Sequence, residues 1–226
     1  MKLVLALHLS DHEQLRTDGR LSPALRAGLA AAGATQVQVN VDDADVAPAQ
    51  LRLATGTQIT AVVMLRGDDL DVGAALDAVH AVDPTAVGWS VEERSPLPPP
   101  EVPDGVRADA LANIAFLRRP VEMSYDAWRS EWLDRHTQVA IDTQATFGYV
   151  QDRVLEALTP DTPPVAGIVE ELFPMAAMTD LHAFYGTGGD DAELRRRLTA
   201  MLDSVGRFGA DRHLDLLPTS RYCYWL

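Results

Sequence analysis

The feature that most constrains the fold is a proline-rich segment at residues 95–105, which divides the 226-residue chain in two. It reads Ser-Pro-Leu-Pro-Pro-Pro-Glu-Val-Pro-Asp-Gly. Proline fixes φ and donates no backbone hydrogen bond, so this segment is expected to be neither helix nor central strand. It is predicted to be a semi-rigid extended linker. About 95 residues precede it and about 120 follow it, enough for one small domain on each side.

The first part of the chain alternates predicted strands and helices. Apolar runs and alternating residues predict strands at 3–9, 36–41, 60–65 and 87–91, and helical spacing predicts helices at 23–32 and 72–82. Polar and apolar residues alternate strictly over 36–41, which predicts one buried face and one solvent-exposed face. The predicted order is β-α-β-β-α-β.

The second part repeats this order. Strands are predicted at 112–117, 146–151, 165–172 and 213–217, and helices at 124–135, 175–185 and 191–205, with Ser124 as an N-cap. Two β-α-β-β-α-β units predict an α+β protein made of two ferredoxin-like units. Each unit leaves one face of its sheet bare, so the sheets are expected to pack together as a pseudo-dimeric α/β barrel around a cavity. The expected domains are residues 1–95 and 106–226, joined by a linker at 96–105.

The amino-acid composition disfavours two classes of binding partner. The net charge of −14, from 19 basic and 33 acidic residues, disfavours binding to nucleic acid and to anionic membranes. The one cysteine, Cys223, excludes an intrachain disulfide and is consistent with a reducing compartment. The apolar start is too short for a signal peptide, and no stretch approaches the roughly 20 apolar residues of a membrane span. We therefore expect a soluble cytoplasmic protein, and the Ala-, Arg- and Asp-rich, Lys-poor composition indicates a bacterial one.

One predicted helix carries an aromatic stripe that ends in a histidine. Trp128, Trp132 and His136 are spaced i, i+4 and i+8, so they share a helix face that is expected to be buried. At the predicted C-terminal end, the helix dipole favours a charged imidazole while burial opposes it. The pKa of His136 is therefore expected near neutrality, which suits proton transfer. The structural alternative is an aromatic core stripe with a capping histidine.

These residues carry a family resemblance. A strand ending in Leu-Arg-Arg-Pro, a Ser-initiated helix with Trp-x3-Trp-x3-His and a strand bearing Tyr-Val-Gln, together spanning about residues 112–152, resemble the EthD family of the dimeric α/β-barrel superfamily. The resemblance implies that His136 points into the barrel cavity, near Trp132, Tyr149 and Gln151. Relatives in the superfamily include polyketide cyclases, cofactor-independent monooxygenases, decarboxylases and haem-degrading enzymes. The first part lacks a Trp-x3-His helix, so it is expected to be degenerate, with one functional pocket in the second part.

The leading interpretation is an enzyme of catabolic or secondary metabolism acting on a small apolar aromatic or polyketide-like compound. It is expected to need no cofactor or metal, and His136 is the candidate proton shuttle. Cyclase, dehydratase, decarboxylase and cofactor-free oxygenase chemistries all remain open. A second polar group at the cavity mouth is His182, for which a helix-surface position is the alternative. The expected ligand-binding residues are Trp128, Trp132, Tyr149, Gln151 and His182.

Two other functions stay open at this stage. The same barrel would suit a non-catalytic small-ligand-binding or accessory protein, and a barrel filled by its own side chains would suit a purely structural role. A covalent pseudo-dimer need not associate further, so a monomer and a homodimer are both compatible with the sequence. The aromatic C-terminal segment, 221–226, is expected to pack on the barrel or on a partner.

Overall fold

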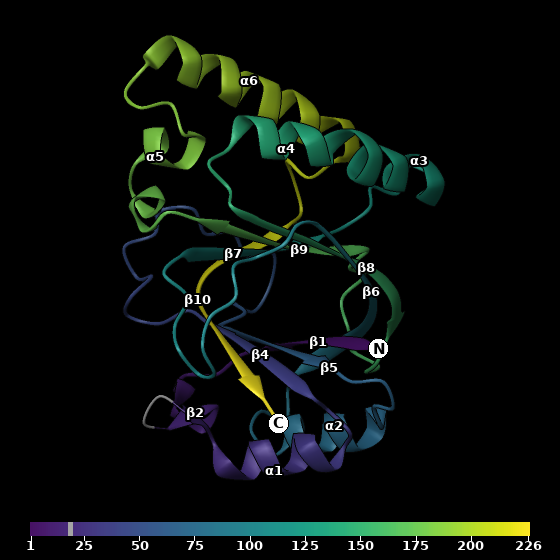
Figure 1. Cartoon of the computed structure of the whole chain (residues 1–226). Coiled ribbons are helices and arrows are strands. Elements are labelled where there is room, and N and C mark those ends of the chain that lie inside the picture. The colour runs from purple at the N-terminus through teal and green to yellow at the C-terminus, as the bar shows by residue number, and fades with distance from the viewer. Residues whose placement is uncertain (18–19) are drawn as a thin grey trace.

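A computed structural model describes residues 1–17 and 20–226, and most of its strands close into a single barrel (Figure 1). Within these residues, eight antiparallel strands are hydrogen-bonded in the order β1-β5-β4-β10-β7-β9-β8-β6. Their bounds are β1 (Lys2–Leu7), β4 (Gln36–Val41), β5 (Ala61–Arg66), β6 (Val87–Leu97), β7 (Leu111–Leu117), β8 (Gly148–Ala157), β9 (Gly167–Phe173) and β10 (Asp215–Trp225). A separate two-stranded sheet pairs β2 (Arg16–Thr17) with β3 (Arg20–Leu21).

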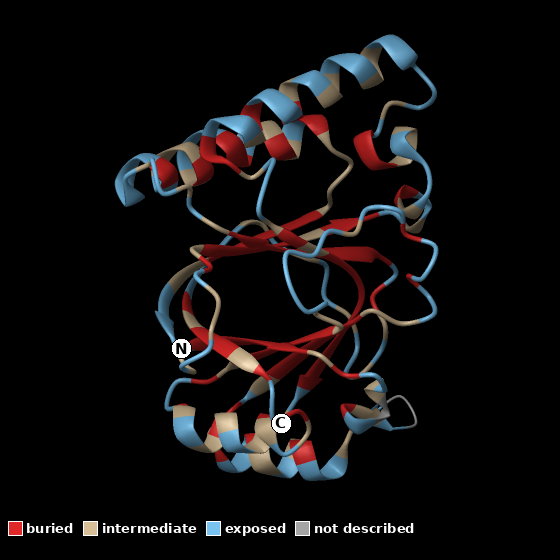
Figure 2. Ribbon diagram, turned by 180° about the vertical axis from the view of Figure 1, so that it is seen from behind, coloured by how far each residue is buried: buried red, intermediate tan, exposed pale blue. Residues whose placement is uncertain are grey.

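Helices cover the barrel from outside, so the fold is mixed α+β. In Figure 1, α1 (Pro23–Ala31) and α2 (Val72–His80) lie below the barrel, and the helices of the second half lie above it. The upper helices are α3 (Tyr125–Ser130), η2 (Glu131–His136), α4 (Thr137–Thr143), α5 (Leu181–Tyr185) and α6 (Asp191–Phe208). Short 3-10 turns form η1 (His12–Gln14) and η3 (Met175–Met178). Buried residues follow the strands and the inner faces of the helices (Figure 2).

The predicted order of strands and helices is confirmed, and several bounds differ. The segment predicted as one helix at 175–185 is divided into η3 and α5, because Asp180 turns to an extended conformation and caps α5 by accepting from the His182 amide. Strand β10 runs to Trp225, eight residues beyond its predicted end. Its aromatic end pairs with β4, so the expectation that this segment packs on the barrel is confirmed.

The proline-rich segment is attached to the barrel. Strand β6 continues to Leu97, which pairs with Tyr149 on β8 only, so the predicted extended linker starts as the end of a strand that is paired on one side. Pro96 falls in a register shift, where a missing amide hydrogen interrupts no regular ladder. Further on, the Gly105 amide donates to the Cys223 carbonyl at 2.7 Å, and the segment lies against β10.

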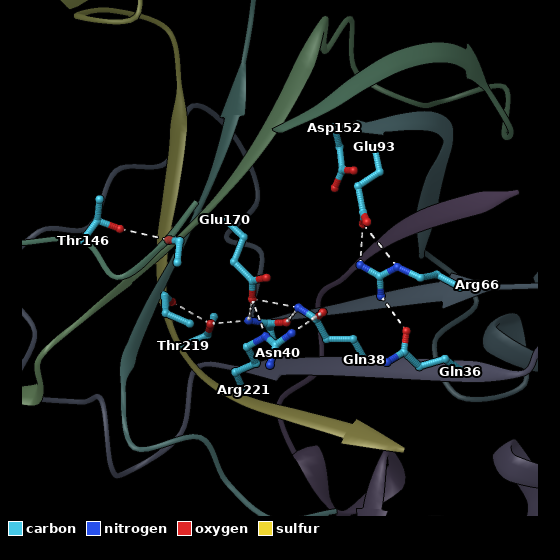
Figure 3. Close-up of polar contacts among 12 residues, drawn as sticks. Gln36, Gln38, Asn40, Arg66, Glu93, Thr146, Asp152, Glu170, Thr219 and Arg221 are labelled. Carbon is cyan, nitrogen blue, oxygen red and sulfur yellow. Dashed lines mark hydrogen bonds and ion pairs between the residues drawn. The ribbon is translucent and has the colours of Figure 1, made fainter. Parts of the chain in front are cut away.

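The barrel interior is filled by two kinds of side chain. The apolar part contains Val4, Ala6, Val62, Met64, Trp89, Ile114, Phe116, Ile168 and Leu217. The polar part is a network centred on Glu170, which accepts hydrogen bonds from Gln38, Asn40 and Arg221 (Figure 3). Strands β4 and β9 are not neighbours, so these bonds cross the interior and join the two halves.

The polar face of β4 is therefore buried, and the prediction that it meets solvent is wrong. Gln38 and Asn40 have no exposed surface. A second polar cluster occupies the same interior, where Lys2 contacts Asp152 at 2.7 Å and Glu93 at 2.6 Å. In the described part of the chain, no helix is long and apolar enough to cross a membrane.

Candidate functional site

The outer face of the second-half sheet and its covering helices enclose an aromatic layer, called below the helix–sheet layer. Trp128 and Trp132 are fully buried in it, with ring centroids 4.9 Å apart. Trp132 lies directly on strand β9, since a side chain at Gly167 would collide with its indole ring. The larger side chains of the layer are Trp128, Trp132, Tyr149, Phe173, Phe184, Tyr185 and Phe208.

The helix that carries the tryptophans is longer than predicted and contains a π turn. It begins at Ser124, whose Oγ accepts from the Ala127 amide, and it continues through η2 to Thr143. The π turn disturbs the regular hydrogen bonds, and the Leu133 carbonyl accepts from Thr137 Oγ1 and from Arg94 instead. Isolated π turns occur often at functional sites.

His136 lies between two helices and outside the barrel. Its Nδ1 is 3.0 Å from Ser204 Oγ on α6, and its ring packs against Phe208 at 4.8 Å. The placement in the barrel cavity that the family resemblance implies is therefore wrong. The helix-end argument also fails, because seven residues of α4 follow His136.

Burial dominates the ionisation of His136. Burial first, and the charge of Arg207 second, lower the pKa of this imidazole from 6.5 to about 4. The ring is therefore neutral at pH 7, and the expectation of a pKa near neutrality is wrong. A neutral ring hydrogen-bonded to Ser204 acts as an oriented donor and acceptor.

The lowered pKa of His136 predicts that the folded protein loses stability in acid. The unfolded chain takes up a proton at His136 near pH 6.5, whereas the folded chain does so near pH 4, so acid favours unfolding across that interval. The shift corresponds to about 3 kcal/mol of unfolding free energy, present above pH 6.5 and lost by pH 4. Urea unfolding at pH 7, 5.5 and 4.5 measures the unfolding free energy of wild type and of His136→Asn. Because only wild type loses this contribution in acid, the difference in unfolding free energy between the two proteins should narrow as the pH falls. A difference that stays constant with pH would contradict the prediction.

Tyr149 and Gln151 lie on the sheet beneath this helix. They are two residues apart on β8, so their side chains lie on the same face of the sheet. Gln151 Oε1 accepts hydrogen bonds from Thr137 Oγ1 and from Arg94, each at 3.2 Å. Trp132, Tyr149 and Gln151 are thus brought together in one layer. His182 is not among them, since its Nδ1 contacts Thr187 Oγ1 at 2.7 Å and its Nε2 lies 3.3 Å from Asp191 near the surface.

The structure adds a carboxyl group that the sequence interpretation overlooked. Glu171 on β9 stands opposite Asn113 on β7 and opposite Tyr149 on β8, so the three form a polar row across the sheet. Burial raises the pKa of the Glu171 carboxyl to about 7. The residue as a whole is half-buried. Within the described residues, no hydrogen bond or ion pair to this carboxyl is found.

The neighbouring phenols remain protonated. Burial first, and the charge of Glu171 second, raise the pKa of Tyr149 well above 10 and that of Tyr185 to about 12. Both hydroxyl groups are therefore hydrogen-bond donors throughout the physiological range. A carboxyl that titrates near neutrality beside protonated phenols suits general acid–base catalysis.

Several buried polar atoms of the layer have no hydrogen-bond partner among the residues that the structure describes. They are Asn113 Oδ1, Gln151 Nε2, Trp132 Nε1 and Trp128 Nε1. Each such atom costs about 1–3 kcal/mol, and native proteins satisfy nearly all of them. The layer thus holds three donors and one acceptor whose hydrogen-bonding capacity the described residues leave unused. In the described part of the chain, no group of three or more His, Cys, Asp and Glu side chains could hold a metal ion.

The sequence did hold a signal for the overlooked residues. Asn113 interrupts the apolar strand β7, and Glu170 with Glu171 interrupts the apolar strand β9. Adjacent residues of a strand point to opposite faces, so one glutamate enters the barrel and the other enters the helix–sheet layer.

Comparison with known proteins supports the fold. No family model matches the chain, and no curated protein matches it in sequence. A solved structure described as an anthrone oxidase-like protein is similar over 99% of this chain and 92% of its own, with a TM-score of 0.54 and 10% identity. A second, provisionally named as a monooxygenase from Fusobacterium nucleatum, has a TM-score of 0.49 and 9% identity over 99% and 93% of the two chains. The first of these likenesses supports the closed-barrel α+β fold of this chain.

Proposed function

We propose that the helix–sheet layer is the active site of an enzyme that removes a proton from a small, largely apolar aromatic or polyketide-like compound. The observation that carries this proposal is the Glu171 carboxyl, which stands opposite Asn113 and Tyr149 in an apolar layer and has no hydrogen-bond partner among the described residues, and whose pKa burial raises to about 7. Trp128, Trp132 and Tyr149 would bind the rings of the substrate, and Gln151 would donate to a substrate oxygen. The proposal places this chain in the EthD group, as two ferredoxin-like units over residues 1–95 and 106–226.

In the proposed reaction, Glu171 accepts a proton from an acidic carbon of the substrate. The negative charge that develops on a conjugated oxygen is stabilised by the unpartnered donors Gln151 Nε2 and Trp132 Nε1. Cyclisation, dehydration, decarboxylation and oxygenation by dioxygen can each follow such a proton transfer. His136 is the second candidate for the proton carrier, because its neutral ring can accept a proton directly.

The first compound to test is anthrone, because the solved protein of the same fold is described as anthrone oxidase-like. Exchange of its methylene protons with D2O, followed by NMR without oxygen, measures proton abstraction independently of any later step. The protein should accelerate exchange, and kcat/KM should rise with pH through about 7, because Glu171 acts as a base only when ionised. A panel of related anthrones and naphthols extends the test. Unaccelerated exchange throughout the panel, or a profile that falls with rising pH, would contradict the proposal.

A further inference from the structure

A pocket lies at one end of the barrel, apart from the helix–sheet layer. Its volume is about 210 Å³, and it is called below the mouth pocket. Both halves of the chain contribute to its wall. The lining residues are His8, Thr55, Gly56, Thr57, Ile59, Val87, Trp89, Phe116, Arg118, Asp161, Pro163, Val165 and Asp215.

The inner wall of the mouth pocket is aromatic and belongs to the apolar part of the barrel interior. Trp89 on β6 and Phe116 on β7 are buried, with ring centroids 5.5 Å apart and planes inclined by 44°. The Trp89 indole is held by a hydrogen bond from its Nε1 to the Pro163 carbonyl at 3.4 Å. A fixed pair of tilted rings favours a flat aromatic guest.

The size of the mouth pocket sets the size of the guest. An apolar cavity of about 150 Å³ accepts benzene, whereas pockets for drug-sized ligands begin at about 300 Å³. A volume of about 210 Å³ therefore fits one aromatic ring with a small substituent.

The charges at the rim favour a neutral guest. Arg118 is paired with Asp215 at 2.7 Å, and the other Asp215 oxygen accepts from the amide and hydroxyl of Thr55. The cation is thus already neutralised, while Asp161 adds a negative charge. An anionic guest would meet repulsion at this rim.

His8 is a polar residue of the pocket wall. Its Nδ1 lies 3.0 Å from the carbonyl oxygen of Gln58, and because a carbonyl only accepts, Nδ1 must carry the hydrogen. In a neutral ring this leaves Nε2 as an acceptor. We propose that the mouth pocket is a second binding site, for a small neutral aromatic molecule with a hydrogen-bond donor, such as a phenol.

Fluorine NMR titration tests this assignment with three probes of equal ring size. 4-Fluorophenol should bind at a Kd on the order of 1 mM or below, and 4-fluorobenzoate should bind at least about tenfold more weakly. His8→Phe keeps an aromatic ring but removes the acceptor, so it should weaken 4-fluorophenol roughly fivefold and leave fluorobenzene unchanged. Equal affinity of wild type and His8→Phe for 4-fluorophenol would overturn the role of His8.

Two blocking variants locate the bound probe. Val87→Phe should fill the mouth pocket, and Thr57→Trp should close it from an exposed position that leaves the core intact. Both should abolish the binding of 4-fluorophenol to the mouth pocket, whereas Leu202→Gln, at an exposed position on α6, should not change it. The site is disproved if wild type binds no probe or if both blocking variants bind normally. These readouts do not depend on the proposed enzymatic activity.

Discussion

Glu171→Gln is expected to lower kcat/KM for proton abstraction by about 10²–10⁴-fold, the range that general acid–base catalysis contributes. The amide keeps the size of the side chain but cannot accept a proton from carbon. The substitution also removes the group that titrates near pH 7, so the remaining activity should lose its rise through that pH. Proton exchange of anthrone in D2O, measured from pH 5.5 to 8.5, gives both results.

Stability separates a catalytic loss from a folding defect. Above pH 7 the folded wild type holds an ionised carboxyl that burial disfavours, so Glu171→Gln should unfold at a temperature at least as high as wild type. Glu156→Gln is the matched control, because Glu156 is exposed on β8. If Glu171→Gln keeps the wild-type kcat/KM and His136→Asn loses it, the proton acceptor is His136 and not Glu171.

Arg221→Met is expected to cost about 3–5 kcal/mol of unfolding free energy, because it leaves a buried carboxylate without its cation. The Arg221 and Glu170 side chains are 9% and 2% exposed, and Nε lies 3.1 Å from Glu170 Oε1. The guanidinium also donates to Gln38 Oε1 at 3.1 Å, so the network that joins the two halves loses two bonds. Urea unfolding at pH 7, with equal m values, measures the change.

A double variant and a surface pair serve as controls for this prediction. In Arg221→Met with Glu170→Gln the buried charge is gone, and the new amide oxygen can still accept from Gln38 and Asn40, so most of the stability should return. Arg212→Met breaks an ion pair with Glu122 in which both side chains are more than half exposed, and it should cost no more than about 1 kcal/mol. Equal losses for Arg212→Met and Arg221→Met would show that burial does not set the cost.

The sequence by itself determined the elements and their order. Apolar runs and helical spacing lie along the chain, so strands such as 36–41 and helices such as 23–32 can be predicted locally. The same locality placed Trp128 and Trp132 on a buried face. It also predicted Ser124 as a helix cap, because capping involves only neighbouring residues.

Only the tertiary structure decided what those faces meet. The polar face of β4 is buried because β9 brings Glu170 across the barrel to it and the neighbouring strand β10 places Arg221 beside it, and no local pattern distinguishes such partners from water. The same limit applies to His136, because its pKa is lowered by burial first and by the charge of Arg207 second, and the packing partners on α6 lie more than fifty residues away in sequence. The pairing of Glu171 with Asn113 and Tyr149 depends on strand register, which is fixed when the sheet forms.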